Sequence, residues 1–116
     1  FKAVNPACKV VALEPSESCT ILCGEIGKHL IEGIADGFVP GIIERHRALL
    51  DEVITVESAE AVQEMRRLAQ KHGLFVGPSS GAHMIAARKL RERHKIEHVV
   101  TFFCDKGEKY INDYWL

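Results

Sequence analysis

The chain has 116 residues, of which 47% are hydrophobic and 7% aromatic, with 15 Lys and Arg against 16 Asp and Glu. A chain of this length buries roughly two-thirds of the surface that it exposes when unfolded, so one packed domain is feasible without disulfide or metal staples. The apolar share excludes intrinsic disorder, and a net charge of −1 provides no field to attract nucleic acid or an anionic membrane. We therefore expect neither as a partner.

No apolar stretch approaches the roughly 20 residues of a membrane span, and the first residues lack the pattern of a signal peptide. These features predict a soluble, cytoplasmic protein. The four cysteines are an even number, but the chain is too large and too apolar to need a disulfide framework. Cys19 and Cys23 have no nearby His or Cys pair to complete a zinc set. We expect reduced, partly buried thiols and no metal site.

The first half of the chain predicts two strands, a glycine-rich loop and a helix. Residues 10–13 and 53–56 are short apolar runs without alternation, which is typical of strands covered on both faces. Between them, residues 16–41 contain six glycine and proline residues, a density more typical of a functional loop than of filler. A helical stripe of apolar residues then follows, with Ser58 as the predicted N-cap and Gly73 as the C-terminal stop.

The second half predicts two more strands, at residues 74–76 and 99–103, and a helix at residues 80–93. That helix has one apolar face and a basic C-terminal end, where the helix dipole favours positive charge. Strands that alternate with helices imply a parallel sheet with crossover connections. We expect a single α/β domain over residues 1–116, three-layered, with a mostly parallel sheet of about four strands and flanking helices.

The segment GPSSGAHMIAARKL is the richest candidate site, because ligands in open parallel sheets bind beyond the carboxyl ends of the strands. Gly77 and Pro78 force a turn, and Gly81 is expected to let the backbone run close to a ligand. A serine before a helix is usually an N-cap that contributes about 1 kcal/mol. Because one serine suffices for a cap, one hydroxyl of Ser79 and Ser80 is left as a candidate ligand contact.

Four segments, in chain order, carry a resemblance to a known family: VVALEPSES, HLIEGIADGFVP, LLDEVITVESAEAVQEMRRLAQKHGLFVGPSSGAHMIAARKL and HVVTFFCDKGEKY. Together they resemble the C-terminal part of cysteine synthase (O-acetylserine sulfhydrylase), one of the fold-type II pyridoxal-phosphate enzymes. The resemblance implies that the chain is a C-terminal fragment of a larger catalytic fold, with pyridoxal 5'-phosphate as the cofactor of the complete enzyme. It also implies a β-replacement reaction that makes L-cysteine from sulfide and an activated serine, either O-acetylserine or O-phosphoserine.

The resemblance implies three cofactor-binding residues. Ser79 matches the first serine of the family's Gly-x-Ser-Ser-Gly motif, whose hydroxyl hydrogen-bonds the pyridine nitrogen. Gly33 matches a glycine whose backbone lies beside cofactor and substrate, although Ala35 and Asp36 replace the commoner Gly-Ala. Cys104 falls where many members have proline, at the edge of the cofactor ring, and its CDKGEKY context looks more like the cysteine synthase B branch. An ordinary turn glycine and a core thiol stay open as alternatives for Gly33 and Cys104.

Surface or capping roles are favoured for all six histidines, because none has a visible partner that would make it titrate in a site. His29 precedes the glycine-rich loop and resembles the family's histidine at that place. Loop packing and substrate contact both stay open for His29.

No catalytic residue is assigned, because the family's Schiff-base lysine, substrate loop and phosphate cup lie upstream of the matched segments. We therefore expect the isolated chain to be inactive. The resemblance also implies a homodimer, with serine acetyltransferase as a protein partner. The alternatives are a fragment of cystathionine β-synthase or of a serine or threonine dehydratase, and a non-catalytic α/β binding or assembly module.

Overall fold

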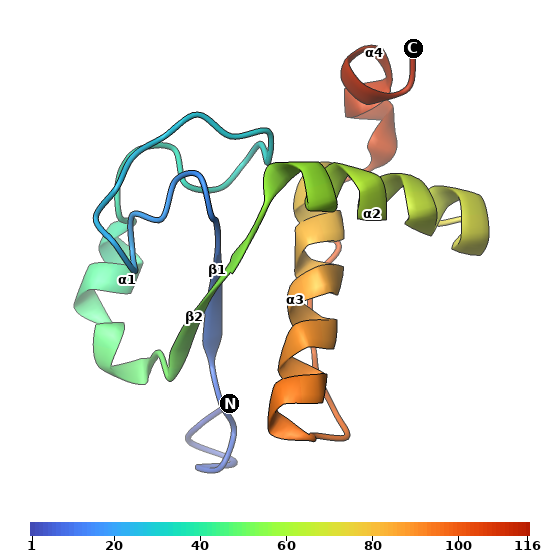
Figure 1. Ribbon diagram of the computed structural model, residues 1–116. Helices are drawn as coiled ribbons and strands as arrows, with labels where there is room; N and C mark the ends of the chain where they lie inside the picture. Colours follow the sequence, from blue (N-terminus) through green and yellow to red (C-terminus); the bar gives the residue numbers. More distant parts are fainter.

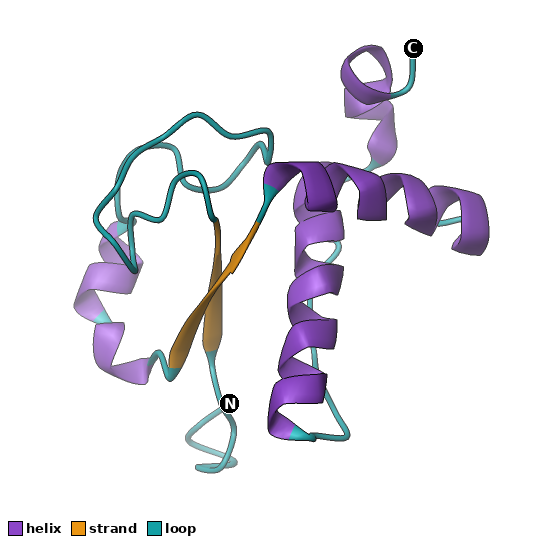
Figure 2. Ribbon diagram, in the orientation of Figure 1, coloured by secondary structure: helices purple, strands orange, loops and turns teal.

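The computed structural model describes residues 1–116, and its sheet consists of two parallel strands (Figure 2). β1 (Val11–Pro15) pairs along its full length with β2 (Glu52–Val56). The connection between them contains the glycine-rich loop, α1 (Gly41–Arg45) and the short 3-10 helix η1 (Arg47–Leu49). A long connection is needed here because two parallel strands cannot be joined by a tight hairpin.

Both predicted helices are confirmed. They are α2 (Ser58–His72) and α3 (Pro78–His94). Gly73 ends α2 in the left-handed conformation, with φ of +68°. Pro78 takes the first position of α3, two residues before the predicted start, because a missing N–H costs nothing in the first helical turn.

The start of α2 is stabilised from a distant part of the chain. Glu57 occupies the N-cap position and makes no side-chain capping bond. The amide of Ser58 donates a 2.9 Å hydrogen bond to Oε1 of Glu17, and the Ser58 hydroxyl accepts the amide of Leu30, also at 2.9 Å. The prediction that Ser58 is the N-cap is therefore wrong. The Glu17 carboxylate, 41 positions away, accepts the hydrogen bond of the Ser58 amide, and its negative charge is stabilising at the positive end of the helix dipole.

Residues 74–76 and 99–103 do not form strands of the sheet. Val76 makes a single antiparallel bridge to Lys106, and residues 99–103 have no ladder partner. The prediction of about four strands is wrong for these two runs, because apolar character alone supplies no neighbour for the backbone hydrogen bonds of a strand. The α/β class with a parallel sheet and flanking helices is confirmed, and Figure 1 shows α1 and α3 on opposite sides of the two strands.

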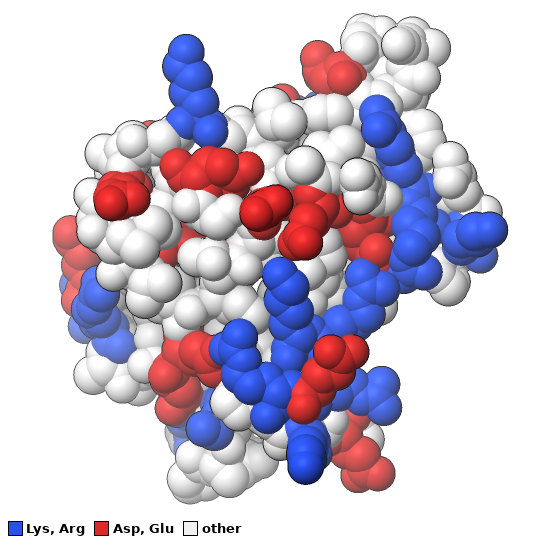
Figure 3. All heavy atoms as spheres, in the orientation of Figure 1, with Lys and Arg blue, Asp and Glu red and all other residues white.

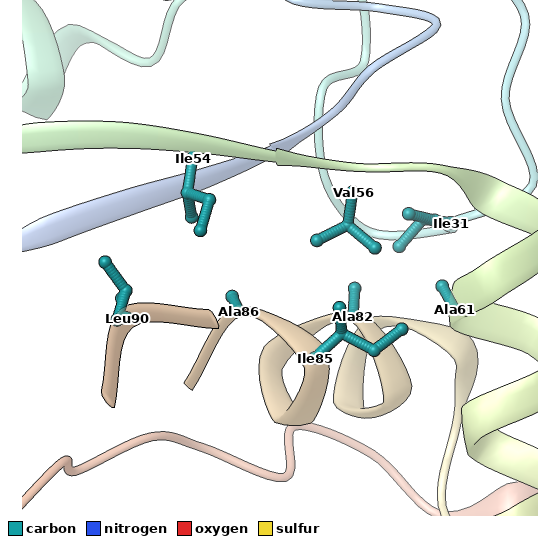
Figure 4. Close-up of a cluster of buried hydrophobic side chains, with 8 residues drawn as sticks. All are labelled: Ile31, Ile54, Val56, Ala61, Ala82, Ile85, Ala86 and Leu90. Carbon is teal, nitrogen blue, oxygen red and sulfur yellow. The ribbon is translucent and has the colours of Figure 1, made fainter. Parts of the chain in front are cut away.

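One apolar cluster joins the sheet, the glycine-rich loop and both long helices (Figure 4). Ile54 and Val56 of β2 face α3, and Ile31 of the loop lies beside Val56 near the start of α2. The remaining members come from the two helices: Ala61, Ala82, Ile85, Ala86 and Leu90. Because Ile31 is fully buried, the glycine-rich loop is fixed to the same core that positions α3.

The C-terminal residues form the 3-10 helix η2 (Gly107–Tyr110) and α4 (Ile111–Tyr114). Arg66 of α2 donates two hydrogen bonds to the carbonyl oxygen of Tyr114, at 3.1 and 2.7 Å. The Tyr114 hydroxyl donates to the carbonyl oxygen of Leu30 at 2.9 Å. The C-terminal segment therefore links α2 to the glycine-rich loop.

Charged side chains on α2 and α3 are largely paired. Glu64 lies 2.8 Å from both Arg67 and Arg88, and Lys89 lies 3.4 Å from Glu60. On the face drawn in Figure 3, basic side chains have acidic ones between and beside them. No helix of the structure combines the length and the apolar character needed to cross a membrane.

Candidate functional site

The first turn of α3 is buried, and its two serines have different environments. Ser79 is 4% exposed and Ser80 is 0% exposed. Neither caps the helix, because Gly77 is the N-cap residue and no side chain makes a capping bond. The Ser80 hydroxyl accepts the amide of Cys104 at 3.2 Å, whereas the Ser79 hydroxyl makes no hydrogen bond within the chain. The Ser79 hydroxyl is therefore free to hydrogen-bond a ligand.

The turn before α3 is held against the segment that carries Cys104. The amide of Gly77 donates to the carbonyl oxygen of Asp105 at 3.1 Å, and the amide of Gly107 donates to that of Phe75 at 3.0 Å. Cys104, which precedes Asp105, is exposed, and its amide contacts the Ser80 hydroxyl. Of the predicted site residues, the structure brings Ser79 and Cys104 into one neighbourhood.

Gly81 is required by the packing of one helix on another. A Cβ at this position would lie 2.9 Å from the Met65 nitrogen and closer still to the carbonyl oxygen of Ala61, both in α2. Figure 1 shows α2 crossing α3 near the start of α3. The close approach that Gly81 allows in the structure is to α2, and its closeness to a ligand stays a prediction.

Gly33 lies on an exposed stretch of the glycine-rich loop. Its φ of +87° is in the region that favours glycine, and a Cβ there would meet nothing within 4 Å. Ile31, two residues earlier, packs in the same core as Ala82 of α3. The loop of Gly33 is thus fixed close to the first turns of α2 and α3, with its own backbone open to a ligand.

His29 belongs to the packing of this loop. Its Nε2 lies 3.1 Å from the carbonyl oxygen of Ala35, and its Nδ1 accepts the amide of Ile31 at 3.2 Å. Of the two roles left open for His29, the structure shows loop packing. Both hydrogen bonds of the His29 ring are to residues close in the sequence, but the residue pattern does not indicate that both ring nitrogens contact backbone groups.

Asp105 and Tyr110 form a polar pair that sequence reasoning missed. The Tyr110 hydroxyl donates to Oδ2 of Asp105 at 2.5 Å, and Oδ1 of Asp105 is buried without a partner. Burial and the contact with Asp105 raise the pKa of Tyr110. A Cβ on Gly77 would lie 2.5 Å from the Tyr110 ring, so this pair fixes the approach of the chain to α3.

The cysteines and other potential metal ligands do not form a cluster. No group of three or more His, Cys, Asp or Glu side chains is arranged to hold a metal ion. Cys19 is buried, Cys23 is exposed and neither forms a disulfide. The hydrogen bond with Cys19 is the main cause that raises the pKa of Cys23 to about 11, so its thiol stays protonated at neutral pH.

Comparison with known sequences adds a family. The family described as pyridoxal-phosphate dependent enzyme matches residues 1–105. The O-ureido-L-serine synthase of Streptomyces lavendulae is 36% identical over 98% of this chain and 35% of its own length. The cysteine synthase B of Campylobacter jejuni is 38% identical over 89% of this chain and 33% of its own length.

Solved structures agree with the sequences. A cysteine synthase from Entamoeba histolytica has a TM-score of 0.89 at 30% identity, over 97% of this chain and 33% of that one. A hydrogen sulfide-producing enzyme from Fusobacterium nucleatum has a TM-score of 0.90 at 37% identity, with the same coverage. The chain spans about a third of the length of these relatives. It belongs to the family of pyridoxal-phosphate-dependent enzymes and is similar, within that family, to cysteine synthases of fold type II.

Proposed function

We propose that the chain is one α/β domain, residues 1–116, of a pyridoxal-phosphate-dependent enzyme that makes L-cysteine from sulfide and an activated serine. Membership of the family supports the cofactor, and the similarity to cysteine synthases supports the reaction. The observation that carries the proposal is Ser79 in the first turn of α3, a residue that is 4% exposed and whose hydroxyl makes no hydrogen bond within the chain. In the complete enzyme this turn would form one wall of the active site.

The residues of this wall fit the cofactor. When bound, pyridoxal phosphate withdraws electrons from the bonds at the substrate's α-carbon. The Ser79 hydroxyl would hydrogen-bond the pyridine nitrogen, and such a bond contributes about 1 kcal/mol. Unlike a carboxylate, a neutral hydroxyl does not hold a proton on that nitrogen. Ser79 would thereby keep the ring a moderate electron acceptor, which favours loss of the substrate's β-substituent.

Gly33 and Cys104 would contact the bound molecules from two further sides. The backbone of Gly33 is exposed and has free space at its Cα, so it would line the substrate side. The amide of Cys104 is fixed by Ser80, the neighbour of Ser79, which would place residue 104 at the edge of the cofactor ring. The anchoring lysine and the phosphate cup would come from the part of the enzyme that this third of its length does not contain.

The natural protein, purified from its source, tests the proposal. We expect a chain longer than 116 residues with the visible absorbance of the bound cofactor, and formation of cysteine from O-acetylserine or O-phosphoserine with sulfide. Size-exclusion chromatography with and without serine acetyltransferase tests the homodimer and that partner. A colourless product of 116 residues that forms no cysteine would contradict the proposal and favour a non-catalytic module.

The acceptor needs its own assay. One relative is an O-ureido-L-serine synthase, and one solved structure of similar fold is an O-acetylserine-dependent cystathionine beta-synthase from Helicobacter pylori. Hydroxyurea and homocysteine, offered in place of sulfide, therefore serve as competing acceptors. We expect the largest kcat/KM with sulfide, and a larger value with either competitor would change the assigned product while keeping the β-replacement.

A further inference from the structure

We propose that His29 is a positioning residue that clamps the glycine-rich loop, and that it acts as a neutral imidazole with its proton on Nε2. The clamp itself stands on hydrogen-bond geometry. Its relevance to substrate rests on the proposed function, which puts the backbone of Gly33 beside the substrate.

The two ring nitrogens of His29 hold the two ends of one short segment. Nδ1 accepts the amide of Ile31 at 3.2 Å, so it carries no proton. Nε2 lies 3.1 Å from the carbonyl oxygen of Ala35, and a carbonyl only accepts, so Nε2 must carry the proton. A histidine ring is protonated on Nδ1, on Nε2 or on both, and the two bonds form together only when the proton is on Nε2 alone. The clamped segment is residues 31–35, with Gly33 at its centre.

The far end of the segment needs such a clamp. Ala35 has φ of +53°, a left-handed conformation that costs a residue with a Cβ about 1–2 kcal/mol. Lys95, the other non-glycine residue with positive φ, ends α3, where this conformation is common. Ala35 ends no helix, and its carbonyl is the group that His29 holds.

The near end of the segment is anchored independently of His29. The Leu30 amide donates to the Ser58 hydroxyl, and the Leu30 carbonyl accepts from the Tyr114 hydroxyl, both at 2.9 Å. Ile31 is fully buried in the core. The position of the Gly33 backbone therefore depends on a core anchor on one side and on His29 on the other. Small displacements of a substrate-contacting backbone are costly in catalysis, which is why a clamp at this point is a positioning device.

NMR spectroscopy of the full 116-residue chain, without cofactor, tests the clamp. In the wild-type chain, we expect the imidazole ¹⁵N shifts of His29 to show protonated Nε2 and unprotonated Nδ1. The variant His29→Phe keeps a ring but removes both bonds. We expect hydrogen exchange at the Ile31 amide to accelerate about five- to tenfold, as for one lost hydrogen bond. The resonances of Gly33 and Ala35 should shift, with no change in the exchange of the Leu30 amide.

The matched control is His46→Phe, because His46 is exposed and its side chain makes no hydrogen bond. It should leave the loop resonances unchanged. A purely structural role of His29 predicts instead a lower melting temperature and shifts throughout the core. A protonated Nδ1 in the wild-type chain would overturn the proposal, even if His29→Phe fails to fold. Unchanged exchange at Ile31 in a folded His29→Phe chain would overturn it as well.

A second substitution tests the link to Ala35. Glycine adopts positive φ without strain, so Ala35→Gly should reduce the effect of His29→Phe on the Gly33 resonances at least twofold. An equal effect in both backgrounds would contradict the role given to Ala35. These measurements need no cofactor and no turnover. The clamp can therefore fail while cysteine synthesis stands, and cysteine synthesis can fail while the clamp stands.

Discussion

The hydroxyl of Ser80 accepts a 3.2 Å hydrogen bond from the amide of Cys104. The two adjacent serines therefore have different roles. The Ser80 hydroxyl holds the segment that contains Cys104, whereas the Ser79 hydroxyl makes no hydrogen bond within the chain. Both residues are buried, and they differ in that only the Ser80 hydroxyl is hydrogen-bonded within the chain. A motif with two serines therefore contains one structural residue and one that a ligand would complete.

Replacement of Ser80 tests this division from the structural side. Ser80→Ala leaves the Cys104 amide without its acceptor, so we expect the free energy of unfolding to fall by about 1 kcal/mol. Hydrogen exchange at Cys104 should become faster. Urea denaturation of the chain measures the first effect and NMR the second. Ser79→Ala is the matched control and should unfold like the wild type; equal losses in both variants would show that the serines share one role.

Gly81 should tolerate no side chain. Gly81→Ala would drive a methyl group into the backbone of α2 at Ala61 and Met65, and we expect destabilisation by about 1–3 kcal/mol. Gly41→Ala is the control, because a methyl group there meets only the end of the Arg45 side chain, at 3.2 Å. Thermal unfolding should separate the two variants. A Gly81→Ala chain with the melting temperature of the wild type would refute the close crossing of α2 and α3.

Glu64 should make stability depend on pH. Hydrogen bonds from Arg67, and then Arg88, lower the pKa of Glu64 below its usual 4.5 although burial opposes them. Because the folded value lies below the unfolded one, this stabilisation is fully present above pH 4.5 and is lost as pH falls through the folded value. Denaturation across acidic pH should show a smaller decline for Glu64→Gln than for the wild type. Glu92→Gln, at an exposed site, should keep the wild-type decline; a parallel Glu64→Gln curve would contradict the ion-pair assignment.

The helices of this fold could be predicted from the sequence because their signals are local. The apolar stripe of α2 and the stop at Gly73 lie within one segment. The strands predicted at residues 74–76 and 99–103 do not form, and local signals could not reveal this, since a strand depends on a partner elsewhere in the chain. The cap of α2 was missed for the same reason: Glu17, which bonds the Ser58 amide, is 41 positions away.

The candidate site shows the same limit. The motif indicates Ser79, and the structure adds that this residue is buried while its hydroxyl makes no hydrogen bond within the chain. Gly81 belongs to the same motif, but it allows α3 to pack closely on α2, and a pattern of residue types does not reveal this contact. The contact of His29 with Ala35 and the pairing of Asp105 with Tyr110 depend on how loops fold, so only the structure shows them.

The visible absorbance of the cofactor-loaded natural protein tests the central assignment, that Ser79 faces the cofactor ring. We expect Ser79→Ala to shift the absorbance maximum and to weaken cofactor binding about fivefold, in line with the loss of one hydrogen bond. The melting temperature of the cofactor-free protein should stay unchanged. An absorbance spectrum and a cofactor affinity identical to those of the wild type would contradict the assignment.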